Sequence, residues 1–80
     1  MELEISDHAA DNMRGRKITR EMVERVLAAR TWEVPQPTAG RRRFEAMIGD
    51  RRLTVIVAVR EVPPVVVTVF WTGVYDGDRE

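Results

Sequence analysis

Two segments of alternating apolar and polar residues, on either side of Gly49-Asp50, leave this 80-residue chain few folds to adopt. Glycine at the first central position of a two-residue turn suits type II′ geometry, which joins antiparallel strands. Such a turn pairs Ala46 with Leu53. One face of the hairpin then receives Phe44, Ala46, Ile48, Leu53, Val55, Val57 and Val59. The other face receives Arg41, Arg43, Glu45, Arg52, Thr54 and Arg60. Because both segments show the alternation independently, they predict a hairpin with one buried face.

The segment before residue 18 predicts a short strand followed by a short helix. Leu3 and Ile5 alternate with glutamates, as in a strand with one buried face. Ser6 is a good N-cap for the helix, and Gly15 is expected to end it in the left-handed conformation. The apolar residues that this helix is expected to bury are Ala9, Ala10 and Met13.

A second helix is predicted over residues 20–29. Thr19 is its expected N-cap. Its apolar stripe at helical spacing consists of Met22, Val23, Val26 and Leu27. Arg20 and Glu24 lie four residues apart, which predicts an ion pair on a solvated face rather than a catalytic carboxylate.

The remaining segments are expected to complete a sheet. Thr31 to Val34 is a possible short strand, and residues 35–40, with two prolines, are expected to form a loop. Val65 to Thr72 is apolar at both parities, which is typical of a central strand covered on each face. The order β-α-α-β-β-β predicts an α+β fold with two N-terminal helices packed on one face of a predominantly antiparallel sheet. Residues 1–80 suffice for one such domain, with 76–80 expected to be a disordered tail.

Composition narrows the classes of function. The chain has no cysteine, so disulfides and thiolate catalysis are excluded and a cytoplasmic location is expected. The longest apolar run, residues 62–71, has about half the length that crosses a bilayer, so no membrane partner is expected. Thirteen basic and thirteen acidic residues cancel, although six arginines lie between residues 41 and 60. A core this small favours extension by self-association, which makes a homodimer a candidate assembly.

The opening of the chain carries a recognisable motif. His8, Asn12 and Arg16 recur at every fourth position and so share one face of the first predicted helix. The pattern His8-Ala9-x-x-Asn12-Met13-x-x-Arg16-x-Ile18-Thr19 resembles the His-Ala-x-x-Arg-Met-x-x-Arg-Gly-Ile-Ser opening of an uncharacterised bacterial family, which is grouped with RelE, ParE and BrnT toxins. Asn12 stands where that opening has Arg, and Lys17 where it has Gly. The resemblance extends over about residues 5–72.

This resemblance implies a RelE/ParE toxin-like fold, and relatives that cleave RNA, often on the ribosome, and are silenced by an antitoxin protein. Cleavage through the 2′-hydroxyl needs a group that takes its proton, a cation for the charge on the phosphorane, and an acid for the leaving oxygen. Histidine is the default proton-transfer residue near neutral pH. His8 is the only histidine, so His8 and Arg16 are the catalytic candidates. The candidates for binding nucleic acid are Arg41, Arg43, Arg52 and Arg60.

Simpler interpretations of the same residues remain open. A histidine in the first turn of a helix is often a surface residue, and arginines on strands often guard an edge against aggregation. No metal-ligand spacing, glycine-rich phosphate loop or Ser-His-Asp arrangement is readable, so no cofactor is expected. The sequence therefore indicates two candidate functions. One is a toxin-like RNA-binding domain of a toxin–antitoxin system, with or without endoribonuclease activity. The other is a non-catalytic module that dimerises or binds a protein partner through its sheet.

Overall fold

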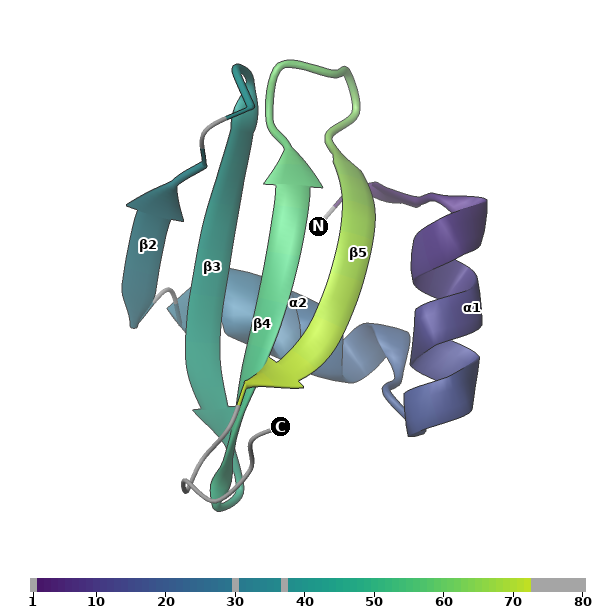
Figure 1. The fold of residues 1–80 in the computed structure, drawn as a ribbon, viewed down its shortest axis with the longest axis vertical. Helices are drawn as coiled ribbons and strands as arrows, with labels where there is room; N and C mark the ends of the chain where they lie inside the picture. The colour runs from purple at the N-terminus through teal and green to yellow at the C-terminus, as the bar shows by residue number, and fades with distance from the viewer. Residues whose placement is uncertain (1, 30, 37, 73–80) are drawn as a thin grey trace.

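Five strands form one mixed sheet in the computed structural model, which describes residues 2–29, 31–36 and 38–72 (Figure 1). In chain order the elements are β1 (Glu4–Ile5), α1 (Asp7–Arg16), α2 (Arg20–Ala29), β2 (Trp32–Pro35), β3 (Arg41–Ile48), β4 (Arg51–Ala58) and β5 (Val65–Thr72). The strands lie side by side in the order β1-β5-β4-β3-β2. Only the β1–β5 pair is parallel among these described strands. The α+β class and the predominantly antiparallel sheet are confirmed. The possible strand at Thr31 to Val34 is present as β2, one residue later than predicted, and it adds one strand to the order β-α-α-β-β-β. The expected tail at 76–80 lies outside the described residues.

The β3–β4 hairpin has the predicted register, in which Ala46 pairs with Leu53. Gly49 has a positive φ of 68°, whereas the next residue does not, and this is the type II′ pattern. The predicted alternation ends with β4. Val59 and Arg60 lie beyond the strand and are both exposed, so the β3–β4 pairing does not test the faces predicted for these two residues.

The sheet face turned toward α2 forms the core. α2 lies across β3 and β4 on this face, behind the sheet in Figure 1. It contributes Val23, Val26 and Leu27 to a buried cluster. The strand residues of this cluster are Phe44, Ala46, Leu53, Val55, Val57, Val66 and Val69. Hydrophobic burial on this one face is the main term that stabilises the fold.

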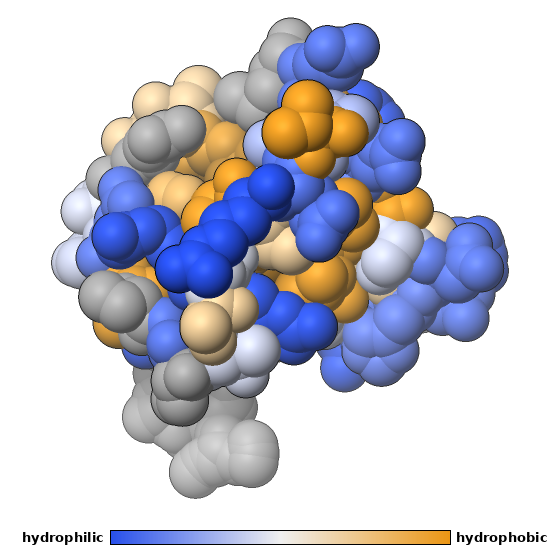
Figure 2. Space-filling model, turned by 90° about the horizontal axis from the view of Figure 1, so that it is seen from above, coloured by the Kyte–Doolittle hydropathy of each residue, from blue (hydrophilic) through white to orange (hydrophobic). Residues whose placement is uncertain are grey.

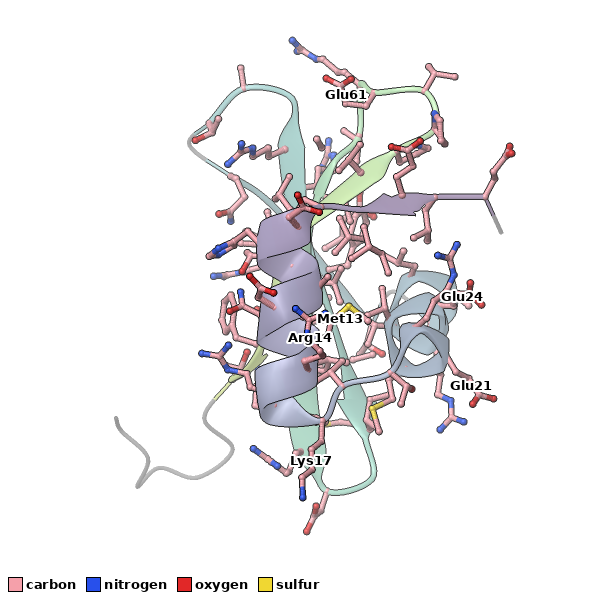
Figure 3. The ribbon with its side chains drawn as sticks, turned by 90° about the vertical axis from the view of Figure 1, so that its right-hand side faces the viewer. Met13, Arg14, Lys17, Glu21, Glu24 and Glu61 are labelled. Atoms are coloured by element: carbon pink, nitrogen blue, oxygen red, sulfur yellow. The ribbon has the colours of Figure 1, made fainter. Side chains whose placement is uncertain are left out.

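α2 begins and faces solvent as predicted. The Thr19 hydroxyl accepts a hydrogen bond from the backbone N–H of Met22 at 3.1 Å, which satisfies one otherwise unpaired donor of the first turn. Glu24 points away from the sheet (Figure 3) and pairs with Arg20 at 3.0 Å. Arg20 also donates to the carbonyl of Leu3 at 3.1 Å, which ties α2 to the start of the chain. Neither described helix has the length and apolar character needed to cross a membrane.

α1 lies along the edge of β5 rather than flat on the core face (Figures 1 and 3). β1 pairs with the first two residues of β5, so no other described strand covers the rest of that edge. Ser6 meets this edge: its backbone N–H donates to the Val66 carbonyl at 3.0 Å, and its hydroxyl donates to the Val67 carbonyl at 3.3 Å. At the other end, Trp71 Nε1 donates to the Arg16 carbonyl at 3.4 Å. The prediction that both helices pack on one face therefore holds for α2, while α1 closes the edge.

The left-handed residue at the end of α1 is Lys17 and not Gly15. Lys17 has φ 57° and ψ 42°, and its N–H donates to the Arg14 carbonyl at 3.4 Å. The N–H of Ile18 donates to the Met13 carbonyl at 2.8 Å, which completes a Schellman motif. Gly15 is helical and lies two residues before the left-handed position, so the predicted role of this glycine is wrong.

Among the described elements, β5 is covered by a helix on one face only, although its sequence predicts burial on both. Val66 and Val69 are fully buried on the core face, and the alternate residues are half-buried. A β-bulge opposite Ile56 and Val57 interrupts the register at Val67. The apolar character of β5 at both parities is therefore explained by α1 at its edge rather than by a second helical layer.

Candidate functional site

The sheet face opposite α2, here called the uncovered face, carries no helix among the described elements (Figure 1). The register places on it the side chains of Trp32, Val34, Arg41, Arg43, Glu45, Met47, Arg52, Thr54, Ile56, Thr68, Phe70 and Thr72. Trp32, Val34 and Met47 are among its exposed apolar residues. This face therefore offers cations and apolar groups side by side.

The polar stripe of α1 lies at the border of the uncovered face. Asn12 Nδ2 donates to Thr68 Oγ1 at 2.9 Å, which ties the helix to β5. The same nitrogen lies 3.3 Å from His8 Nε2, and Asn12 Oδ1 accepts from Arg16 Nη1 at 2.9 Å. The predicted stripe is thus a hydrogen-bonded row with Asn12 at its centre.

His8 and Arg41 line one hollow of about 470 Å3. Its other lining residues are Ser6, Gln36, Thr38, Ile56, Val67 and Thr68. Figure 2 looks down on this end of the sheet and shows hydrophilic side chains gathered there with apolar ones between them. The chain positions that meet here are far apart, because the start of α1, the start of β3 and the bulged part of β5 converge at the same end. This hollow brings a titratable ring and a guanidinium to the same space.

Arg43 and Arg52, by contrast, are held by a carboxylate. Glu45 is only 6% exposed, and its Oε2 lies 3.0 Å from Arg43 Nε while its Oε1 lies 3.4 Å from Arg52 Nη1. Arg43 Nε is close to Glu45 but is not oriented to donate a hydrogen bond to it. The guanidinium of Arg52 also stacks on Trp32, 3.9 Å from the ring centroid. These four residues are here called the Trp32 cluster, and their charges sum to +1.

Arg60 does not line the hollow of His8, but it lies near Arg41, which does. It sits in the turn after β4 beside Gly40, where an added Cβ would come within 3.2 Å of the Arg60 side chain. Gly40 has φ 80°, a left-handed conformation that favours glycine. Arg60 and Arg41 line a second hollow of about 300 Å3. Arg41 therefore lines both hollows.

The structure divides the six predicted site residues into two groups. His8, Arg16, Arg41 and Arg60 lie along one end and border of the uncovered face, and Arg43 and Arg52 lie in the Trp32 cluster. The sequence placed Asn12 on the polar stripe of the first helix without giving it a role, and it assigned neither Glu45 nor Trp32 to the site. Glu45 could have been found, because Arg43 lies two residues before it on the same strand and the hairpin register brings Arg52 diagonally next to it. Among the described residues, no group of three or more acidic or histidine side chains is placed to hold a metal ion.

Comparison with known proteins identifies a family. The profile of a domain of unknown function, DUF4258, matches residues 5–71. This range includes both helices and all the described strands, except for Glu4 at the start of β1 and Thr72 at the end of β5. The searches of curated proteins and of solved structures returned no match. Since the profile covers most of the 80 residues, the chain belongs to the DUF4258 family.

Proposed function

We propose that this chain is a toxin-like domain of the RelE, ParE and BrnT type that binds single-stranded RNA on its uncovered face. The observation that carries the proposal is the hollow shared by His8 and Arg41. A guanidinium binds a phosphodiester through parallel N–H donors, and an imidazole beside it can exchange a proton with the adjacent ribose. An antitoxin protein that covers this face is the corresponding physiological partner.

The proposal gives each residue of the hollow a task. Arg41 binds the phosphate, and His8 takes the proton of the 2′-hydroxyl. The 2′-oxygen then bonds to phosphorus, the bond to the 5′-oxygen breaks, and solvent protonates that oxygen, leaving a cyclic phosphate and a 5′-hydroxyl. Asn12 fixes the position of His8, and Arg16 adds positive charge to the same row.

An RNA cleavage and binding assay with matched variants tests the proposal. His8→Ala is expected to abolish cleavage, since general acid–base catalysis typically contributes about 100-fold or more. Arg14→Ala is the control on the same helix, because Arg14 is exposed and pairs with Asp11 instead of lining the hollow. For binding, Arg41→Ala is compared with Arg25→Ala, an exposed residue of α2 on the opposite side of the sheet. Equal RNA affinity for these two arginine variants would contradict the proposed phosphate site.

Salt dependence provides a second test of RNA binding. Each phosphate contact to single-stranded RNA releases counterions and contributes about 0.7 to the slope of log affinity against log salt. Three contacts therefore predict a loss of roughly twenty-fold between 50 and 200 mM salt. Arg41→Ala is expected to reduce the slope by about one contact, while Arg25→Ala leaves it unchanged. A wild-type affinity that does not depend on salt would refute phosphate binding.

A second candidate function is a non-catalytic module that dimerises or binds a protein partner through its sheet. The observation that favours it is the pairing of Arg43 and Arg52 with Glu45, which removes much of the positive charge from the middle of the uncovered face. Apolar association is not screened by salt. A dimer whose mass in solution is the same from 50 to 200 mM salt, together with no RNA affinity at 50 mM, would favour this module over RNA binding.

A further inference from the structure

We infer that the Trp32 cluster is a second RNA subsite, which stacks one unpaired base on the indole of Trp32. This inference rests on the proposed RNA binding and adds to it a preference for single strands. The cluster consists of Trp32, Arg43, Glu45 and Arg52 on neighbouring strands β2, β3 and β4. It is separate from the hollow of His8, since none of its residues lines that hollow.

Trp32 is presented as a fixed and accessible ring. Trp32 pairs with Glu45 in the β2–β3 ladder, which places its side chain on the uncovered face. Arg52 stacks on the ring, with its guanidinium carbon 3.9 Å from the ring centroid. Trp32 is nevertheless 38% exposed, so a second flat group can reach it. A buried tryptophan would be explained by packing alone, but a ring held by a guanidinium and open to solvent is the arrangement that stacks nucleobases.

The charges of the cluster fit one phosphodiester. Two guanidiniums and one carboxylate leave a net charge of +1, which matches the single negative charge of a backbone phosphate. Each guanidinium has five N–H donors. Glu45 approaches Arg43 through one nitrogen and Arg52 through one nitrogen, so donors remain on both side chains. Glu45 is therefore a positioning residue, which holds the two arginines beside the Trp32 ring.

The spacing allows one short strand of RNA to reach both sites. Arg41 and Glu45 are separated by four residues of β3, or roughly 13 Å along an extended strand. Their side chains are on the same face, because residues at even separations in a strand point the same way. A phosphate at Arg41 and a base on Trp32 are thus compatible with a single oligonucleotide. A duplex cannot use the second site, since its bases are already paired and stacked.

The first experiment measures the affinity of a fluorescein-labelled single-stranded RNA hexamer by anisotropy. Trp32→Ala is expected to weaken binding roughly tenfold, because stacking on an aromatic side chain contributes about 1–3 kcal/mol per base. Trp32→Leu tests whether apolar bulk suffices, and it too is expected to bind weakly. Val34→Ala is the matched control, since Val34 is exposed on the same face of the same strand and is expected to leave the affinity unchanged. Circular dichroism verifies that each variant is folded.

The salt slope separates stacking from charge. Trp32→Ala removes no phosphate contact, so it is expected to lower affinity at every salt concentration without changing the slope. Arg43→Ala is expected to reduce the slope by about one contact. A change of slope in Trp32→Ala equal to that in Arg43→Ala would mean that Trp32 acts only by holding Arg52, and it would overturn the stacking subsite.

Fluorescence of Trp32 gives a direct readout. In Trp71→Phe protein, the emission comes from Trp32, and the RNA hexamer is expected to quench it by stacking. Polyphosphate, which has the charge of RNA but no bases, is expected to leave the emission unchanged. Equal quenching by both polymers would contradict base stacking.

The outcomes distinguish this inference from the proposed function. If wild-type protein binds the hexamer and Trp32→Ala binds it equally well, the stacking subsite is refuted and the RNA-binding function remains. If wild-type protein binds neither the hexamer nor the duplex, the proposed function fails and the subsite fails with it. Equal affinity for the single-stranded hexamer and for an RNA duplex of the same sequence would refute the preference for single strands.

Discussion

The two faces of the sheet use the same strands in different ways. On the core face, neighbouring strand residues such as Phe44, Val55 and Val69 are buried against α2 and its cluster. On the uncovered face, the alternate positions carry apolar residues together with arginines, threonines and a glutamate, several of which pair with one another through their side chains. One face is therefore held by burial of apolar surface, and the other by local polar pairing.

This difference predicts that stability and the proposed function are separable. Removal of a buried apolar group leaves a cavity, whereas removal of an exposed polar group usually changes stability by less than about 0.5 kcal/mol. We therefore expect the uncovered face to tolerate substitutions that the core face does not.

The largest effect is expected at Leu53, which is fully buried on the core face. Leu53→Ala should reduce the free energy of unfolding by about 3 kcal/mol through lost burial and the cavity it leaves. Met47→Ala, on the uncovered face of the neighbouring strand, should reduce it by less than about 0.5 kcal/mol. Urea unfolding measures both. Similar losses for the two variants would mean that the uncovered face is packed against something that the described residues do not include.

Thr54 tests the boundary between the two faces, since it lies on the uncovered face and yet is fully buried. Its hydroxyl forms a hydrogen bond with the hydroxyl of Thr72 on β5. Thr54→Val keeps the shape of the side chain and removes this bond, which should cost about 1 kcal/mol by urea unfolding. Thr54→Ser, which keeps the hydroxyl, is the control for the hydrogen bond. A valine variant as stable as wild type would show that the polar pairing on this face does not stabilise the fold.

Lys17 allows stability to be raised without touching either face. A residue other than glycine in the left-handed conformation costs about 1–2 kcal/mol per residue, so Lys17→Gly should raise the free energy of unfolding by roughly 1 kcal/mol. Arg14→Gly, three residues earlier in the helix, should lower it by about 1 kcal/mol. Thermal unfolding by circular dichroism measures both changes. RNA affinity should be unchanged in Lys17→Gly, and a gain in affinity would mean that binding depends on overall stability rather than on the uncovered face.

The smallest effect is expected at Glu24, on the outer side of α2 (Figure 3). Its pair with Arg20 is half exposed, so Glu24→Ala should cost only a few tenths of a kcal/mol. Thr19→Ala, at the start of the same helix, should cost about 1 kcal/mol through the lost cap. Equal losses for the two variants would show that Glu24 contributes more than a solvated ion pair.

The sequence predicted the elements that depend on local rules. The register of the hairpin followed from Gly49 and from alternation, and Ser6 and Thr19 cap the two helices as expected. The predicted end of α1 was wrong, because glycine is only the commonest residue in the left-handed conformation and Lys17 adopts that conformation here. The conformational preferences of single residues do not predict such an exception.

The candidate site was less predictable, because it depends on contacts between distant segments. Nothing in the α1 sequence indicates that the helix closes the edge of β5, so the position of His8 relative to Arg41 could not be derived. The pairing of Glu45 with two arginines was within reach of the sequence once the register was known, since cross-strand diagonals are set by the register. The sequence predicted the polar stripe that contains His8, but it did not predict the hydrogen bond that ties this stripe to Thr68.

The parallel pairing of β1 with β5 has a consequence for folding. Glu4 lies opposite Val65, and its N–H donates to the Pro64 carbonyl at 2.8 Å, so this contact closes a loop of about sixty residues. Contacts of such long sequence separation are entropically costly and slow a folding reaction, whereas the β3–β4 hairpin closes over only a two-residue turn. Ser6 and His8 follow β1 directly and reach the hollow only when β1 has docked. The hairpin can therefore form without the hollow, whereas the RNA binding proposed there would require the longest-range contact of the sheet to be in place.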